Sequence, residues 1–157
     1  GLLQSAKDAA ELAMITDLVR NDLQQVCVPR SVKVPCARRL VELPYAVQAV
    51  SDVEGVLRTG VTARDVLAVM HPAGSITGAP RGMACSMIEQ LERAPRGAYC
   101  GALGLVSGER AVFSVLIRTA ERAPGGMFTL GVGGGITWDS DAAAEADEVR
   151  TKLGVLG

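Results

Sequence analysis

The order of helical and strand-like patterns along the chain restricts its fold more than any other feature of the sequence. Four segments are predicted to be helices, from the spacing of their apolar residues or from capping residues at their starts: residues 5–24, 62–70, 80–93 and 141–153. Strand-like runs lie between them in groups, not one strand after each helix. Helices and strands that do not alternate regularly predict an α+β fold.

The strands are predicted in two groups. In the first group, residues 32–34 and 45–50 are separated by a connection that begins at Pro35. The second group contains the segments 98–106, 111–120 and 127–137. Short turns join these three segments, so we expect an antiparallel meander.

The composition limits the class of protein. The chain has 157 residues, 48% of them hydrophobic, and its 16 Lys and Arg against 17 Asp and Glu give a net charge of −1. One globular domain is expected at this length, and without a basic excess nucleic acid is not an expected partner. Glycines and a proline interrupt the longest uncharged stretch, residues 123–138. We therefore predict no membrane span and, since no secretory signal is visible, a cytoplasmic location.

Two pairs of acidic residues could supply metal ligands. Asp8 and Glu11 lie three residues apart on the first predicted helix, and Glu145 and Glu148 have the same spacing on the last. Carboxylate oxygens are the ligands that Mg²⁺ favours. Acidic pairs near helix starts are also commonly solvated and stabilised by the helix dipole, so the spacing leaves both interpretations open.

Arg118 falls among apolar residues of the predicted strand 111–120. A charge in or beside a core needs a partner, and a guanidinium can bind a carboxylate through two hydrogen bonds. That partner is either an acidic side chain of the chain or a carboxylate ligand. The glycine-rich loops at residues 74–78 and 131–135 lack the spacing of nucleotide-binding motifs, and predict either turns with positive φ or a close approach of backbone to an anion.

Five motifs follow one another in an order that resembles a known family. They are Lys7-Asp8-Ala9-Ala10-Glu11 with residues 14–23, the loop 72–80, Arg96-Gly97-Ala98-Tyr99-Cys100-Gly101, Ile117-Arg118-Thr119, and residues 133–148 with Lys152. In this order they resemble the C-terminal part of the chorismate-binding enzymes, which include anthranilate synthase component I, aminodeoxychorismate synthase component I and the isochorismate and salicylate synthases. The resemblance implies that residues 1–157 are the C-terminal portion of a single domain, a β-sandwich flanked by helices, whose N-terminal portion is missing.

The resemblance also implies which residues form the site. Glu11 and Glu148 match the Mg²⁺-binding glutamates of the family, and Asp8 and Glu145 match its neighbouring acidic positions. Positions that hold the substrate's carboxylates are matched by Tyr99, Arg118, the backbone at Gly133, and Lys152, while Ser75 and Thr77 lie on the loop beside the pocket. The family's lysine, whose amine attacks C2 of chorismate, would lie upstream of Gly1, so the isolated chain is expected to show no turnover.

Within the family, residues 17–23 and 133–141 look most like aminodeoxychorismate synthase component I. That enzyme adds ammonia to C4 of chorismate, keeps the enolpyruvyl group and serves para-aminobenzoate and folate biosynthesis. Gln48 occupies a place where anthranilate synthases typically carry a histidine near the leaving pyruvate. The resemblance implies Mg²⁺ as cofactor, and chorismate and a glutaminase subunit or domain as partners. Anthranilate synthase component I, of tryptophan biosynthesis, and a non-catalytic fragment that binds only anions and metal remain as alternatives.

Overall fold

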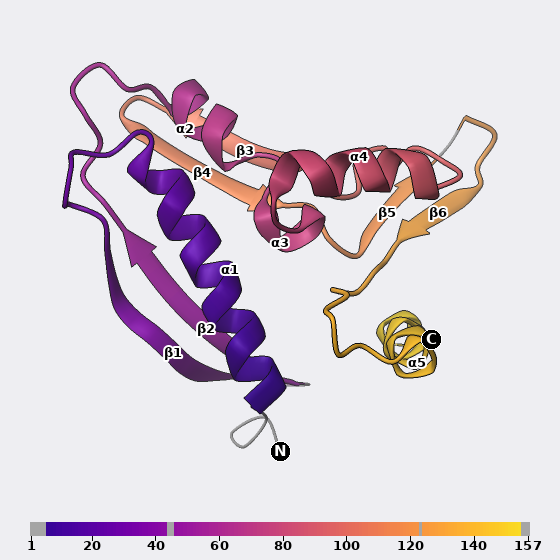
Figure 1. The fold of residues 1–157 in the computed structure, drawn as a ribbon. Coiled ribbons are helices and arrows are strands. Elements are labelled where there is room, and N and C mark those ends of the chain that lie inside the picture. Colours follow the sequence, from indigo (N-terminus) through magenta and orange to yellow (C-terminus); the bar gives the residue numbers. More distant parts are fainter. Residues whose placement is uncertain (1–5, 44–45, 123, 155–157) are drawn as a thin grey trace. The chain divides into compact units, whose positions relative to one another are not determined.

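The computed structural model describes residues 6–43, 46–122 and 124–154, with the side chains of residues 6–8 and 46 outside this description. The chain divides into two compact units, Gly1–Gly74 and Ser75–Gly157. Each unit combines helices with antiparallel strands (Figure 1), which confirms the predicted α+β class. Among the described residues, no helix is both long enough and apolar enough to cross a membrane.

The first unit is a helix packed on a two-stranded hairpin. Strands β1 (Lys33–Leu43) and β2 (Ala46–Glu54) pair antiparallel, and α1 (Ala6–Gln24) contacts both strands and α2 (Ala63–Met70) (Figure 1). The chain after α1 is fixed against the chain after β2, where the Val28 amide donates to the Val56 carbonyl at 2.7 Å. Val26 and Cys27 are buried there, at 4% and 1% exposure.

The predicted connection at Pro35 is wrong, because β1 runs through this residue. The register of the β1–β2 pair shifts between Lys33 and Cys36 and again between Cys36 and Arg39. Proline cannot donate a hydrogen bond to a neighbouring strand, but it is tolerated where a bulge interrupts the ladder. The irregular register therefore allows one long strand where the sequence predicted a break.

The helix starts are set by local capping. Thr62 caps α2 through a capping box, in which its hydroxyl accepts from the Asp65 amide and Asp65 Oδ2 accepts from the Thr62 amide at 2.8 Å. The Thr62 hydroxyl and amide lower the pKa of Asp65 below 3.8. Pro80, expected as the first helical residue of the next segment, is instead the N-cap of α4 (Arg81–Leu91). Between them lies a short helix that the sequence did not predict, α3 (Gly74–Thr77).

The second unit contains two separate hairpins and not the predicted meander. Strand β3 (Ala102–Ser107) pairs with β4 (Arg110–Val115), and β5 (Thr119–Arg122) pairs with β6 (Phe128–Gly131). The predicted strand 111–120 is interrupted because Arg118 has φ of 50°, a left-handed conformation that ends a strand. The last helix is α5 (Ala142–Leu153), and the Asp141 side chain caps it by accepting from the amides of Ala143 and Ala144.

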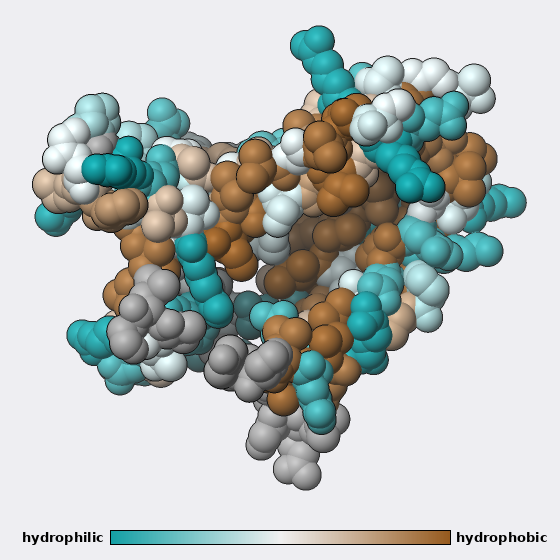
Figure 2. All heavy atoms as spheres, turned by 180° about the vertical axis from the view of Figure 1, so that it is seen from behind, coloured by the Kyte–Doolittle hydropathy of each residue, from teal (hydrophilic) through white to brown (hydrophobic). Residues whose placement is uncertain are grey.

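Large apolar side chains remain exposed on the second unit, and apolar surface is visible on the face of the molecule in Figure 2. On the β3–β4 hairpin, Leu103, Leu105 and Val112 are 66%, 72% and 72% exposed. Among the described residues of the second unit, Cys100 is the one hydrophobic residue that is buried. Its amide donates to the Leu116 carbonyl at 2.7 Å. The turn before β3 is therefore better packed than the hairpin that follows it.

Tyr99 fastens that turn to the β5–β6 hairpin. Its ring lies on the backbone of Gly131, where a Cβ would be 2.3 Å from the Tyr99 Cγ. From β5, Glu121 Oε1 accepts hydrogen bonds from the amides of Ala98 and Tyr99 at 2.9 and 3.3 Å. The ring and the backbone of Tyr99 are thus both held by residues that follow it by more than twenty positions.

We expect Gly131→Ala to destabilise the chain by about 1–3 kcal/mol, because the added methyl group would force the Tyr99 ring away from β6. The free energy of unfolding from urea titration measures this. Gly82→Ala is the matched control. No atom lies within 4 Å of a Cβ at Gly82 in α4, so alanine there should stabilise by about 0.5–1 kcal/mol. Equal effects of the two substitutions would contradict the packing described here.

Burial of the phenol predicts a second measurable property. Desolvation raises the pKa of Tyr99 above its usual 10.0. The difference in tyrosinate absorbance between wild type and Tyr99→Phe should therefore show deprotonation above pH 10. Because folding favours the neutral phenol, its contribution to stability is present below pH 10 and is lost as the pH rises through the raised pKa. A Tyr99 pKa at or below 10.0 would contradict this burial.

Candidate functional site

Lys152 connects the glycine-rich loop to the last helix. Its ammonium donates to the Gly133 carbonyl at 3.1 Å and pairs with Glu148 Oε1 at 2.6 Å. The Lys152 side chain is 24% exposed, whereas that of Glu148 is 52% exposed. Glu148 and Lys152 are one turn apart on α5, the spacing at which opposite charges meet on a helix. The cation is therefore held at the edge of the loop by one carbonyl and one carboxylate.

Glu145 lies in the first turn of α5, where the helix dipole favours a negative charge. Ser140 Oγ donates to Glu145 Oε1 at 2.6 Å, and Oε2 lies 3.5 Å from the position a Cβ would take at Gly134. The carboxylate thus faces the backbone of the glycine-rich loop. Glu145 and Glu148 both lie close to this loop, directly in one case and through Lys152 in the other.

The phenol of Tyr99 contacts the same loop, although Tyr99 lies more than thirty residues earlier in the sequence. A Cβ at Gly133 would lie 2.6 Å from the Tyr99 hydroxyl, so only glycine allows this approach. The structure thereby brings together five of the predicted site residues: Tyr99, Gly133, Glu145, Glu148 and Lys152. We call these five residues the loop cluster. Their roles in binding stay predictions.

Arg118 is exposed at the bend between β4 and β5. It lies outside any strand, so the prediction of a charge inside an apolar strand is wrong. Among the residues that the structure describes, no carboxylate pairs with its guanidinium. An exposed guanidinium needs no partner inside the fold, so the predicted carboxylate ligand of Arg118 stays a prediction.

The other predicted substrate-binding residues of the second unit lie on α3. Ser75 is exposed and Thr77 is half-buried. Between them, the Ile76 carbonyl accepts a hydrogen bond from Arg96 Nη1 at 2.8 Å. The predicted loop is thus a single helical turn, anchored at its middle residue.

The remaining predicted residues belong to the first unit. Glu11 is half-buried on α1, and Gln48 is exposed on β2 opposite Val41. Asp8 lies in α1, but its side chain is outside the described residues. No group of three or more His, Cys, Asp or Glu side chains in the described part of the chain is arranged to hold a metal ion. Glu11 and Asp8 therefore remain predicted ligands.

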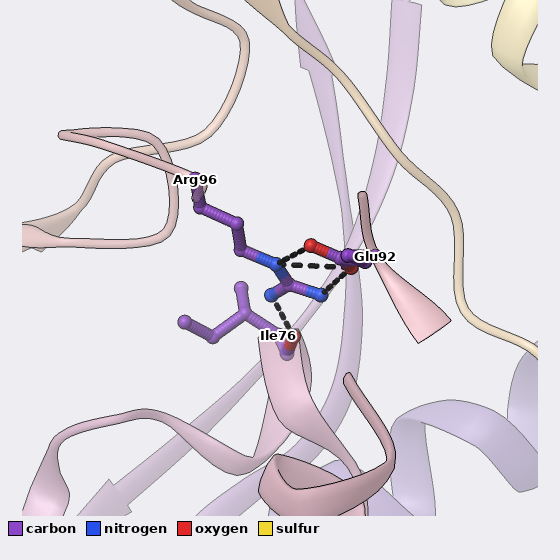
Figure 3. Close-up of polar contacts among 3 residues, drawn as sticks. All are labelled: Ile76, Glu92 and Arg96. Carbon is purple, nitrogen blue, oxygen red and sulfur yellow. Dashed lines mark hydrogen bonds and ion pairs between the residues drawn. The ribbon is translucent and has the colours of Figure 1, made fainter. Parts of the chain in front are cut away.

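Sequence reasoning missed the side chains that support Tyr99. Arg96 forms a forked pair with Glu92 (Figure 3) and lies 6.0 Å from the centre of the Tyr99 ring. The hydrogen bond to Glu92 raises the pKa of Arg96 and lowers that of Glu92 below 4.5. Arg96 stands in the same quoted motif as Tyr99, which was the available signal. No feature of the sequence indicated Glu121, because only the fold brings its carboxylate to the Tyr99 backbone.

Comparisons with known proteins identify the family of the chain. The family described as chorismate binding enzyme matches residues 1–156. Anthranilate synthase component 1 of Saccharolobus solfataricus is 41% identical over 156 residues, which cover 99% of this chain and 37% of that protein. Aminodeoxychorismate synthase component 1 of Salmonella typhimurium is 40% identical over 154 residues, 97% of this chain and 34% of that protein. The chain thus spans little more than a third of these relatives.

Solved structures show the same similarity. Anthranilate synthase component I from Streptococcus pneumoniae superposes with a TM-score of 0.87 and 34% identity, over 96% of this chain and 35% of that one. A structure titled as a 2,3-dihydroxybenzoate-specific isochorismate synthase from Bacillus anthracis shares the fold, with a TM-score of 0.77 at 22% identity, over 98% of this chain and 40% of that one. With the family matched over almost its whole length, the chain belongs to the chorismate-binding enzymes.

Proposed function

We propose that residues 1–157 bind the carboxylates of chorismate and a magnesium ion for an enzyme that aminates chorismate at C4, as aminodeoxychorismate synthase component I does. The observation that carries this proposal is the loop cluster, in which a phenol, an ammonium and two carboxylates surround one glycine-rich loop. Such a set can hold both a carboxylate and a cation. Para-aminobenzoate synthesis, ammonia from a glutaminase partner and a cytoplasmic location belong to the same proposal.

The donor set fits magnesium in its chemistry. Glu145 and Glu148 offer hard carboxylate oxygens from one helix, as Mg²⁺ prefers. Bound there, Mg²⁺ would draw electron density toward the ring carboxylate of chorismate and so favour departure of the C4 hydroxyl. Glu11 and Asp8 of α1 are the other ligands that the family resemblance implies.

The chain's own cations and phenol would bind and orient the substrate. Chorismate is a dianion, so the Lys152 ammonium and the Arg118 guanidinium would neutralise its enolpyruvyl carboxylate. The Tyr99 hydroxyl and backbone groups at Gly133 would fix the direction of that carboxylate. In the structure Lys152 Nζ pairs with Glu148 Oε1, so substrate binding by Lys152 and metal binding by Glu148 would both compete with this pair. The ion pair thus links the two binding events.

Anthranilate synthase component I is the second candidate. The relative from Saccharolobus solfataricus and the solved structure from Streptococcus pneumoniae carry that name. Gln48, in the place of a histidine typical of anthranilate synthases, favours retention of the enolpyruvyl group and hence the first candidate. The two candidates share the loop cluster and differ in whether pyruvate is eliminated.

The reaction product distinguishes these candidates. We expect the complete natural chain that contains residues 1–157 to convert chorismate, ammonia and Mg²⁺ to an aminated product without releasing pyruvate. Chromatography of the product and an enzymatic pyruvate assay measure this. Stoichiometric pyruvate together with fluorescent anthranilate would establish the second candidate instead. The isolated 157-residue chain should be inactive, and turnover by it would refute the predicted need for an upstream lysine.

Metal and substrate affinity test the loop cluster directly by calorimetry. Glu148→Gln should weaken Mg²⁺-dependent chorismate binding about tenfold or more, as expected for a lost charged contact. Asp147→Asn is the matched control, because Asp147 is 71% exposed and pairs with Arg150. Lys152→Met should strengthen Mg²⁺ binding without chorismate, since it frees Glu148, and weaken chorismate binding. Chorismate affinity that is independent of Mg²⁺ would contradict the assignment of the loop cluster to Mg²⁺-dependent chorismate binding.

A further inference from the structure

Arg96 makes directed contacts in addition to its ion pair with Glu92. Its Nε lies 2.9 Å from Glu92 Oε2, and its Nη2 lies 2.6 Å from Glu92 Oε1 (Figure 3). Its remaining terminal nitrogen, Nη1, donates to the Ile76 carbonyl at 2.8 Å. Glu92 is the C-cap of α4, where its amide bonds to the Ile88 carbonyl. One guanidinium therefore joins the end of α4 to the middle of α3.

The guanidinium carbon of Arg96 lies over the ring of Tyr99. The distance from Arg96 Cζ to the ring centre is 6.0 Å, and the Arg96 side chain is 24% exposed. The backbone between them turns at Gly97, with φ of 65°, which glycine adopts without strain. A Cβ at Gly97 would also lie 2.8 Å from Glu121 Oε1. Arg96 and Glu121 thus support the ring and the backbone of Tyr99 respectively.

These contacts need an arginine. The forked pair with Glu92 and the bond to Ile76 use donors that diverge in one plane, while the guanidinium carbon lies over the Tyr99 ring. A lysine ammonium has no planar face and no fixed fork. Exposed ion pairs of the chain, such as Arg39 with Asp52 on the β1–β2 hairpin, have no such third and fourth contacts among those described.

From this geometry we propose that Arg96 is a positioning residue for substrate binding: it fixes the Tyr99 ring against the glycine-rich loop and holds the turn that carries Ser75 and Thr77. This rests on the proposed binding of chorismate at the loop cluster. Arg96 itself touches no substrate in this proposal. It acts by holding three segments, α3, the end of α4 and the Tyr99 turn, in one arrangement before the substrate arrives.

A double-mutant cycle in the complete natural chain tests the proposal through chorismate affinity. We expect Arg96→Met, which keeps the length of the side chain, to weaken chorismate binding about tenfold. In a Tyr99→Phe background the same change should weaken binding threefold or less, because the hydroxyl that Arg96 positions is already absent. Arg96→Lys should restore little of the loss. Arg39→Met, which removes the exposed ion pair with Asp52, should leave the affinity unchanged.

A spectroscopic readout keeps the proposal testable without substrate. With ¹³C-labelled tyrosine, the ring signals that disappear in Tyr99→Phe belong to Tyr99. Those signals should move toward unfolded values in Arg96→Met and stay in place in Arg39→Met, while circular dichroism confirms that both variants remain folded.

The outcomes separate this proposal from the proposed function. If the wild type does not bind chorismate but the Tyr99 signals move in Arg96→Met, the proposed function fails and the positioning of Tyr99 stands. If the Tyr99 signals stay in place, or if Arg96→Met weakens binding by the same factor in both backgrounds, the positioning role is wrong. An Arg96→Met variant that no longer folds is replaced by Glu92→Gln, which should move the same signals in the same direction.

Discussion

The candidate site depends on the contact between the Tyr99 ring and the bare backbone of Gly131 and Gly133. A side chain at either glycine would occupy the space of the ring or its hydroxyl, at 2.3 and 2.6 Å. The absence of a Cβ therefore brings an aromatic side chain from residue 99 onto a loop more than thirty residues later. The hydrogen bonds from Glu121 and the guanidinium of Arg96 stabilise the turn that presents this ring. The packing and the polar contacts support the same arrangement.

Two cations lie near this contact, Arg96 and Lys152, and their contacts hold them differently. The guanidinium nitrogens of Arg96 donate to Glu92 and to the Ile76 carbonyl, so Arg96 has a structural role. Lys152 is held by one carbonyl and one carboxylate oxygen, which is a weaker restraint because the pair is not forked as that of Arg96 with Glu92 is. A cation in that position can exchange partners. This difference explains why we assign positioning to Arg96 and substrate binding to Lys152.

The β3–β4 hairpin leaves its large apolar side chains largely uncovered. Leu103, Leu105 and Val112 expose most of their surface on the β3–β4 hairpin, and two-stranded sheets bury little by themselves. The chain spans about a third of the relatives to which it is similar. The binding contacts described here are nevertheless local to the second unit. They can form wherever the Tyr99 turn, the glycine-rich loop and α5 are in place.

The sequence by itself determined the longer helices and the family, but not the short helix α3. Periodicity and caps act over three or four residues, so α1, α2 and α5 were predicted within a residue of their ends, and ordered motifs identified the chorismate-binding enzymes. Tertiary structure alone decided the passage of β1 through Pro35, the bend at Arg118 and the partners of Tyr99 and Arg96. The strand pairing of β1 and the contacts of Tyr99 with Glu121 and of Arg96 with Ile76 join residues far apart in the chain, and such pairing leaves no local pattern. The Glu148–Lys152 pair lies between the two cases: its spacing is local, but only the fold adds the Gly133 carbonyl that directs Lys152 to the loop.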